Sequence, residues 1–157
     1  MARQIDTIII HHSAGSGGSL EEIRRIPVED NGWSDIGYHA IITNGCDIGG
    51  RLSEDAPLGM LFWGRPEYIV GAHCRNNNVG SLGVCVIGNF DTMPVPPEQE
   101  HTLVLLLKDW CDRYGVLKDR AEIIGHREAP GHHSNACPGQ NLFVRLPHII
   151  KAVRNLT

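Results

Sequence analysis

Two imidazoles stand at the ends of apolar segments, and one thiol follows the second of them. His11 ends the apolar run in "IDTIIIHHSAG", His126 ends "AEIIGH", and Cys137 begins "CPG". Zn²⁺ prefers imidazole and thiolate ligands, and three protein ligands leave its fourth tetrahedral position open for water, as in catalytic zinc sites. From residue types alone, zinc is the leading hypothesis. The alternative is that the histidines are structural and Cys137 is a small buried apolar residue.

The histidine doublet at residues 11 and 12 cannot readily serve one site with both rings. In a strand, neighbouring side chains point to opposite faces. His11 therefore shares a face with Ile9, and His12 shares the other face with Ile8 and Ile10. We predict that only one member of the doublet faces a metal and that the other is a hydrogen-bonded structural residue.

The segments around these residues alternate between strand and helix patterns. Ser19 and Glu22 predict a capping box at the start of a helix that Pro27 breaks or bends. Asn44-Gly45 predicts a hairpin turn between two strands. The pattern predicts an α/β fold with a central mixed β-sheet flanked by helices, in a single domain spanning residues 1–157. The expected strands are 5–12, 36–43, 46–52, 81–90 and 121–126, the expected helices follow residue 19 and span 97–114 and 142–155, and 58–70 is expected to be a loop.

Composition narrows the class of protein. The 157 residues are 41% hydrophobic and 20% charged, and the net charge of −4 does not suggest nucleic-acid binding. No apolar run approaches the length of a membrane span, and the first residues lack a secretory signal. We therefore expect synthesis in the cytoplasm and no stable membrane association. Five cysteines, an odd number, argue against a full disulfide framework.

Five blocks, in order, resemble the zinc-dependent N-acetylmuramoyl-L-alanine amidases of the phage-lysozyme and peptidoglycan-recognition-protein type. They are "IDTIIIHHSAG", "GWSDIGYHAII", "VGAHCRNNNVGSLGVCVIGNF", "IIGHREAPG" and "ACPG". The resemblance implies one Zn²⁺ per chain, bound by His11, His126 and Cys137. It also implies that Tyr38 faces the metal and stabilises an oxyanion. Without the resemblance, we would expect Tyr38 to be a structural strand tyrosine, packed with its hydroxyl hydrogen-bonded.

The resemblance also implies a substrate groove. It suggests substrate-binding roles for His73, Asn78 and Asn135, although Asn78 fits equally well as a loop residue that satisfies its own backbone. Many relatives have lysine or threonine where this chain has Asn135. His132 or His133 could replace that residue as a proton donor, and the sequence leaves the choice open.

The expected activity is hydrolysis of the amide between N-acetylmuramic acid and L-alanine of peptidoglycan. The expected setting is a bacteriolytic phage endolysin without a separate cell-wall-binding module, acting on the wall after the membrane is breached. We expect a monomer whose partner is peptidoglycan. The alternatives are a non-catalytic peptidoglycan-binding protein and a cytosolic muropeptide-recycling amidase, although the latter has aspartate where this chain has Cys137.

Overall fold

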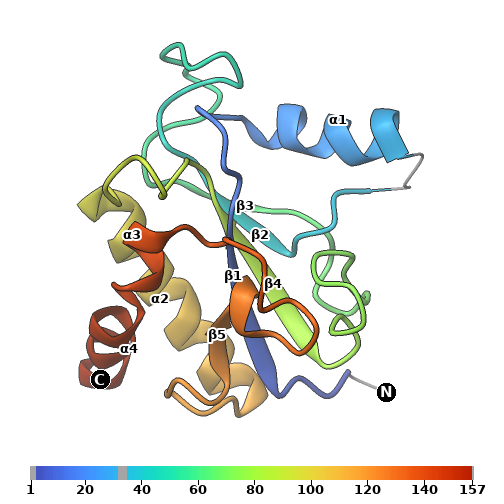
Figure 1. The fold of residues 1–157 in the computed structure, drawn as a ribbon, viewed down its shortest axis with the longest axis vertical. Coiled ribbons are helices and arrows are strands. Elements are labelled where there is room, and N and C mark those ends of the chain that lie inside the picture. Colours follow the sequence, from blue (N-terminus) through green and yellow to red (C-terminus); the bar gives the residue numbers. More distant parts are fainter. Residues whose placement is uncertain (1–2, 32–34, 157) are drawn as a thin grey trace.

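A five-stranded mixed sheet forms the centre of the computed structural model, which describes residues 3–31 and 35–156 (Figure 1). The strand order is β3-β2-β4-β1-β5, and all neighbouring strands are parallel except β2 and β3. The predicted α/β class with a mixed sheet is confirmed. The elements are β1 (Thr7–His12), α1 (Leu20–Asn31), β2 (Ala40–Ile42), β3 (Leu61–Trp63), β4 (Ser81–Val86), α2 (Pro97–Tyr114), β5 (Ile123–Gly125), the 3₁₀ turn η1 (His126–Glu128), α3 (Gln140–Phe143) and α4 (Leu146–Asn155).

The two faces of the sheet have different coverings. On one face, Ile8 and Ile10 belong to the main core, which includes Leu107 of α2 and Ile149 of α4. On the other face, Ile23 of α1 packs in a smaller cluster. Figure 1 shows α2, α3 and α4 gathered on one side and α1 apart from them. In the described part of the chain, no helix is both long and apolar enough to span a membrane.

The helix signals in the sequence are largely confirmed. The Ser19 backbone N–H donates to the Glu22 carboxylate at 3.0 Å, and the Glu22 N–H donates to the Ser19 hydroxyl at 3.2 Å, which is the predicted capping box. Helix α2 has the predicted bounds and ends at Gly115, whose φ of 73° is left-handed. Pro27 does not break α1, because the helix continues to Asn31, and a bend at Pro27 stays a prediction. Residues 32–34 of the block "GWSDIGYHAII" lie outside the described residues.

The predicted hairpin partner of β2 is wrong. Residues 46–52 do not form the return strand, and β3 pairs with β2 from within the segment expected to be a loop. The physical reason lies in Asp47, whose carboxylate accepts the N–H groups of Gly49 and Arg51 at 2.9 and 3.0 Å. These bonds close 46–52 on itself, with only one isolated bridge between Cys46 and Leu52.

Further boundaries differ from the sequence prediction, and the strand expected over 36–43 is limited to β2. The strand expected over 81–90 ends at Val86, shortly before Gly88 takes a positive φ of 145°. The strand expected over 121–126 is limited to β5 and gives way to η1. The helix expected over 142–155 is divided into α3 and α4, and Pro147 lies in the first turn of α4, where its missing N–H is tolerated. All five cysteines are free thiols.

Candidate metal centre

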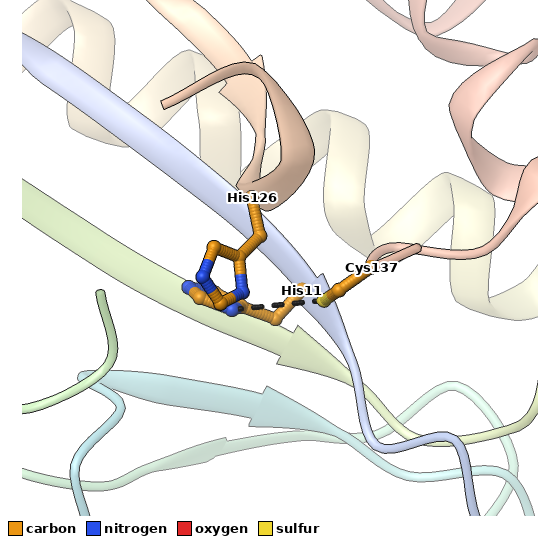
Figure 2. Close-up of side chains that lie close together, drawn as sticks. All are labelled: His11, His126 and Cys137. Atoms are coloured by element: carbon orange, nitrogen blue, oxygen red, sulfur yellow. Dashed lines mark hydrogen bonds between the residues drawn. The ribbon is translucent and has the colours of Figure 1, made fainter. Parts of the chain in front are cut away.

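His11, His126 and Cys137 converge at the carboxyl ends of β1 and β5 (Figure 2). These strands are parallel neighbours, and Ile10 lies opposite Gly125. The next residues, His11 and His126, therefore reach the same edge of the sheet. One donor atom from each of the three residues lies within 4.8 Å of the other two. The His11 Nδ1 lies 3.8 Å from the Cys137 Sγ. Side chains from three separate segments therefore form one compact donor set.

Short-range contacts position Cys137. Its backbone N–H donates to the Asn135 carboxamide oxygen at 2.7 Å, which fixes the turn that leads into the thiol. The His12 N–H points at the Cys137 sulfur at 3.3 Å. Two residues later, Gly139 has φ of 88°, and a Cβ there would lie 2.7 Å from the Phe90 carbonyl carbon. Glycine is thus required for the loop to pack against the end of the sheet.

His12 lies outside this donor set. Its Nδ1 accepts the Phe90 N–H at 3.2 Å, and its ring stacks on the Phe90 ring. The alternation of β1 thus places the two histidines of the doublet in different environments, in the arrangement the sequence predicts.

His73 lies beneath His11. The His73 Nδ1 is 2.9 Å from the His11 Nε2, and the His73 Nε2 is 3.2 Å from the Ser81 hydroxyl. The ring rests on the sheet over Gly83, where a Cβ would lie 2.5 Å from the His73 Cγ. His73 is buried behind His11, and both of its ring nitrogens have partners within the protein; its substrate-binding role stays a prediction.

His126 has a similar neighbour. Its Nε2 lies 3.0 Å from the Nδ1 of His132, whose Nε2 lies 2.9 Å from the Arg75 carbonyl oxygen. Both nitrogens of His132 therefore have partners within the protein. Cys74, His126 and His132 form a second group whose donor atoms lie within 4.8 Å of one another.

Tyr38 lies beside the donor set. Its ring centroid is 5.1 Å from that of His11, in an edge-on arrangement. The neighbouring Cys85 thiol, followed by burial, raises the pKa of Tyr38 well above its usual value. The phenol thus keeps its proton at neutral pH and remains a hydrogen-bond donor.

The two predicted asparagines are engaged locally. The Asn78 carboxamide oxygen accepts the N–H groups of His73 and Cys74 at 3.0 and 2.9 Å, the loop-satisfying role that the sequence left open. Asn135 is exposed, and its oxygen holds the Cys137 turn. The substrate-binding roles of both residues stay predictions.

Burial sets the protonation of the donor set. It lowers the pKa of His11 well below its usual value, and burial together with His132 lowers the pKa of His126 to about 4. Burial also raises the pKa of the Cys137 thiol to about 12. Without a cation the centre is therefore neutral. Two imidazoles with available lone pairs and one thiol fit a divalent zinc ion, which binds neutral histidine and displaces the thiol proton.

Comparison with known proteins places the chain in a family. The family model for N-acetylmuramoyl-L-alanine amidase matches residues 1–140. The chain belongs to this family. Peptidoglycan-recognition protein SC2 of Drosophila melanogaster is 30% identical over 151 residues, which cover 91% of this chain and 73% of that protein. Human N-acetylmuramoyl-L-alanine amidase is 29% identical over 140 residues, which cover 87% of this chain and 21% of that protein.

Solved structures of amidases have the same fold. N-acetylmuramoyl-L-alanine amidase LysC from Clostridium intestinale URNW superposes with a TM-score of 0.76 at 27% identity, covering 99% of this chain and 88% of that chain. The endolysine amidase LysCS from the same source gives 0.75 at 27% identity, covering 99% and 86%.

The sequence does not show that His73 and His132 contact His11 and His126. The family resemblance suggests a groove residue in His73 and leaves His132 as a possible proton donor, because nothing in their spacing shows which ring nitrogens meet. A usable signal existed in Gly83, which interrupts the apolar strand "SLGVCV". Glycine inside a strand often marks a close approach by another group.

Proposed function

We propose that the chain is a zinc-dependent N-acetylmuramoyl-L-alanine amidase that hydrolyses the amide between N-acetylmuramic acid and L-alanine of peptidoglycan. The observation that carries the proposal is the convergence of His11, His126 and Cys137 in a chain of the amidase family. A recognition protein that only binds the wall has no need of such a complete donor set.

The donor set fits zinc in number and chemistry. Two nitrogens and one sulfur leave one of four positions for solvent, and His126 and Cys137 are only half-buried, so the centre can be reached from outside. Zinc in such a site lowers the pKa of a bound water towards about 7 and polarises a carbonyl oxygen.

Tyr38 would stabilise the charge that develops on the scissile carbonyl oxygen. Its raised pKa keeps the hydroxyl protonated, and its ring lies against His11, one of the three proposed ligands. A positioned hydroxyl donates a hydrogen bond that strengthens as the oxygen becomes negative.

A phage endolysin is the setting we favour. The similarity to the endolysine amidase LysCS covers nearly the whole of this chain, and the third ligand is Cys137. The second candidate is a non-catalytic peptidoglycan-binding protein, which the similarity to peptidoglycan-recognition protein SC2 favours.

Digestion of purified peptidoglycan, followed by mass spectrometry of the released fragments, tests the proposal. With zinc, we expect stem peptides with a free L-alanine amino group and glycan strands without new reducing ends. A chelator should stop the release, and zinc should restore it. If the protein binds peptidoglycan but releases no fragments at any zinc concentration, its function is peptidoglycan binding and the amidase proposal fails.

A further inference from the structure

Both proposed histidine ligands are backed by a second histidine, and both chains of hydrogen bonds end on the same loop. His11 meets His73, and His126 meets His132. The endpoints are the carbonyl oxygens of Arg75 and Asn77, in the loop that follows His73. A carbonyl oxygen only accepts hydrogen bonds, so each endpoint fixes the direction of its chain.

When both rings are neutral, the hydrogen bonds from His126 through His132 to Arg75 allow only one placement of the ring protons. The Arg75 oxygen accepts, so the proton of His132 is on Nε2 and its Nδ1 has a lone pair. That lone pair lies 3.0 Å from the His126 Nε2, which must therefore be the protonated nitrogen. The lone pair of His126 is left on Nδ1. A neutral imidazole binds a metal through its unprotonated nitrogen, and its other N–H sets the tautomer.

The hydrogen bonds from His11 through His73 to Ser81 also leave the lone pair of the ligand histidine on Nδ1. The Ser81 hydroxyl donates its one proton to the Asn77 carbonyl oxygen at 2.7 Å, so the hydroxyl oxygen accepts the His73 Nε2–H. The His73 Nδ1 then accepts the His11 Nε2–H at 2.9 Å. The lone pair of His11 is left on Nδ1, the atom that lies 3.8 Å from the Cys137 sulfur.

We propose that His132 is a positioning residue that holds His126 in the tautomer and orientation needed to bind the metal through Nδ1. The inference rests on the proposed function, because it assumes the zinc centre. His132 lies in the loop between two of the ligands and is half-buried, so replacing it need not disturb the core. His73 has the corresponding role for His11 but lies inside the fold.

The proton on His126 Nε2, between His126 and His132, also determines whether the centre binds one metal ion or two. Cys74, His126 and His132 form a donor group, but a cation there would take the place of the proton between His126 and His132. While that proton holds the His126 tautomer, His126 serves one ion, and the centre binds one zinc per chain.

Zinc affinity, measured by competition with a chromophoric chelator, tests the role of His132. We expect His132→Ala to weaken zinc binding by about 10- to 100-fold, the usual effect of losing an outer hydrogen-bond partner. His132→Asn places a carboxamide oxygen near the former Nδ1 and should recover part of the loss. His133→Ala, at an exposed neighbouring position, should leave the zinc affinity at the wild-type value.

Nitrogen NMR of the metal-free protein supplies a readout independent of affinity. Wild-type His126 should show the Nε2–H tautomer, and His132→Ala should show a mixture. A zinc affinity of His132→Ala equal to wild type, or an Nδ1–H tautomer of His126 in the wild type, would overturn the inference. So would two zinc ions per chain, one of them lost with His132. Failure of the proposed function is a different result, in which the wild type itself binds no zinc or releases no fragments.

Discussion

The two halves of the donor set are built differently. His11 is on the interior strand β1, is 1% exposed, and has the buried residues His73 and Ser81 behind it. His126 and Cys137 are half-buried and belong to η1 and the loop before α3. The inner half is held by the sheet and the outer half by a few local hydrogen bonds. We infer that a buried strand fixes one ligand, while loops bring the others to it and leave an open side for substrate.

The largest expected effect comes from the outer half. Cys137→Ala removes the only sulfur of the donor set and should abolish both zinc binding and fragment release. His12→Asn is the matched control, because a carboxamide oxygen can still accept the Phe90 N–H. It should retain zinc and most of the activity. Equal zinc loss in the two variants would show that the assignment of strand faces is wrong.

Tyr38→Phe separates chemistry from metal binding. Loss of one donor to the developing oxyanion should lower kcat by about 10²- to 10³-fold. Zinc affinity should stay unchanged, because the phenol is not part of the donor set. Steady-state kinetics on a soluble muropeptide and the chelator assay measure the two effects. Unchanged kcat would remove Tyr38 from the reaction.

Gly83→Ala tests the inner half. The new Cβ would lie 2.5 Å from the His73 Cγ, so His73 must move and its bond to His11 must lengthen. Overpacking of this kind costs about 1–3 kcal/mol of unfolding free energy. Zinc affinity should fall as well. Gly15→Ala is the control, since a Cβ there meets no atom closer than 3.9 Å, and urea denaturation should show it to be near wild type.

The smallest expected effect is a pH dependence of stability in the metal-free protein. Burial lowers the pKa of His73 to about 3, whereas histidine in an unfolded chain has a pKa of about 6.5. The unfolded state therefore takes up the proton first. The contribution of neutral His73 to the free energy of unfolding is fully present above about pH 6.5 and declines as the pH falls towards 3. Urea denaturation with chelator at pH 7 and pH 4.5 should show a lower free energy of unfolding at pH 4.5, to which His11 and His126 also contribute because burial lowers their pKa values too. A His73→Asn variant should show a smaller loss.

The sequence predicted those parts of the molecule that local pattern decides. Alternation along β1 separated His11 from His12, and Ser19 with Glu22 identified the start of α1. The partner of β2 was not predictable in this way, because the hydrogen bonds of Asp47 divert the chain after a strong turn signal.

Contacts between distant segments account for the rest. The meeting of His126 with His132, and of His132 with Arg75, depends on how two loops pack, and sequence spacing does not encode this. The assignment of the donor set to zinc came through family resemblance, since residue types alone made zinc the leading hypothesis and no more.

X-ray absorption at the zinc edge of the loaded protein tests the central claim most directly. The account predicts one zinc per chain with two nitrogen scatterers at about 2.0–2.1 Å, one sulfur at about 2.3 Å and one further light atom. In Cys137→Ser the sulfur signal should vanish. A wild-type spectrum without sulfur, or with the same sulfur signal after this substitution, would contradict the account.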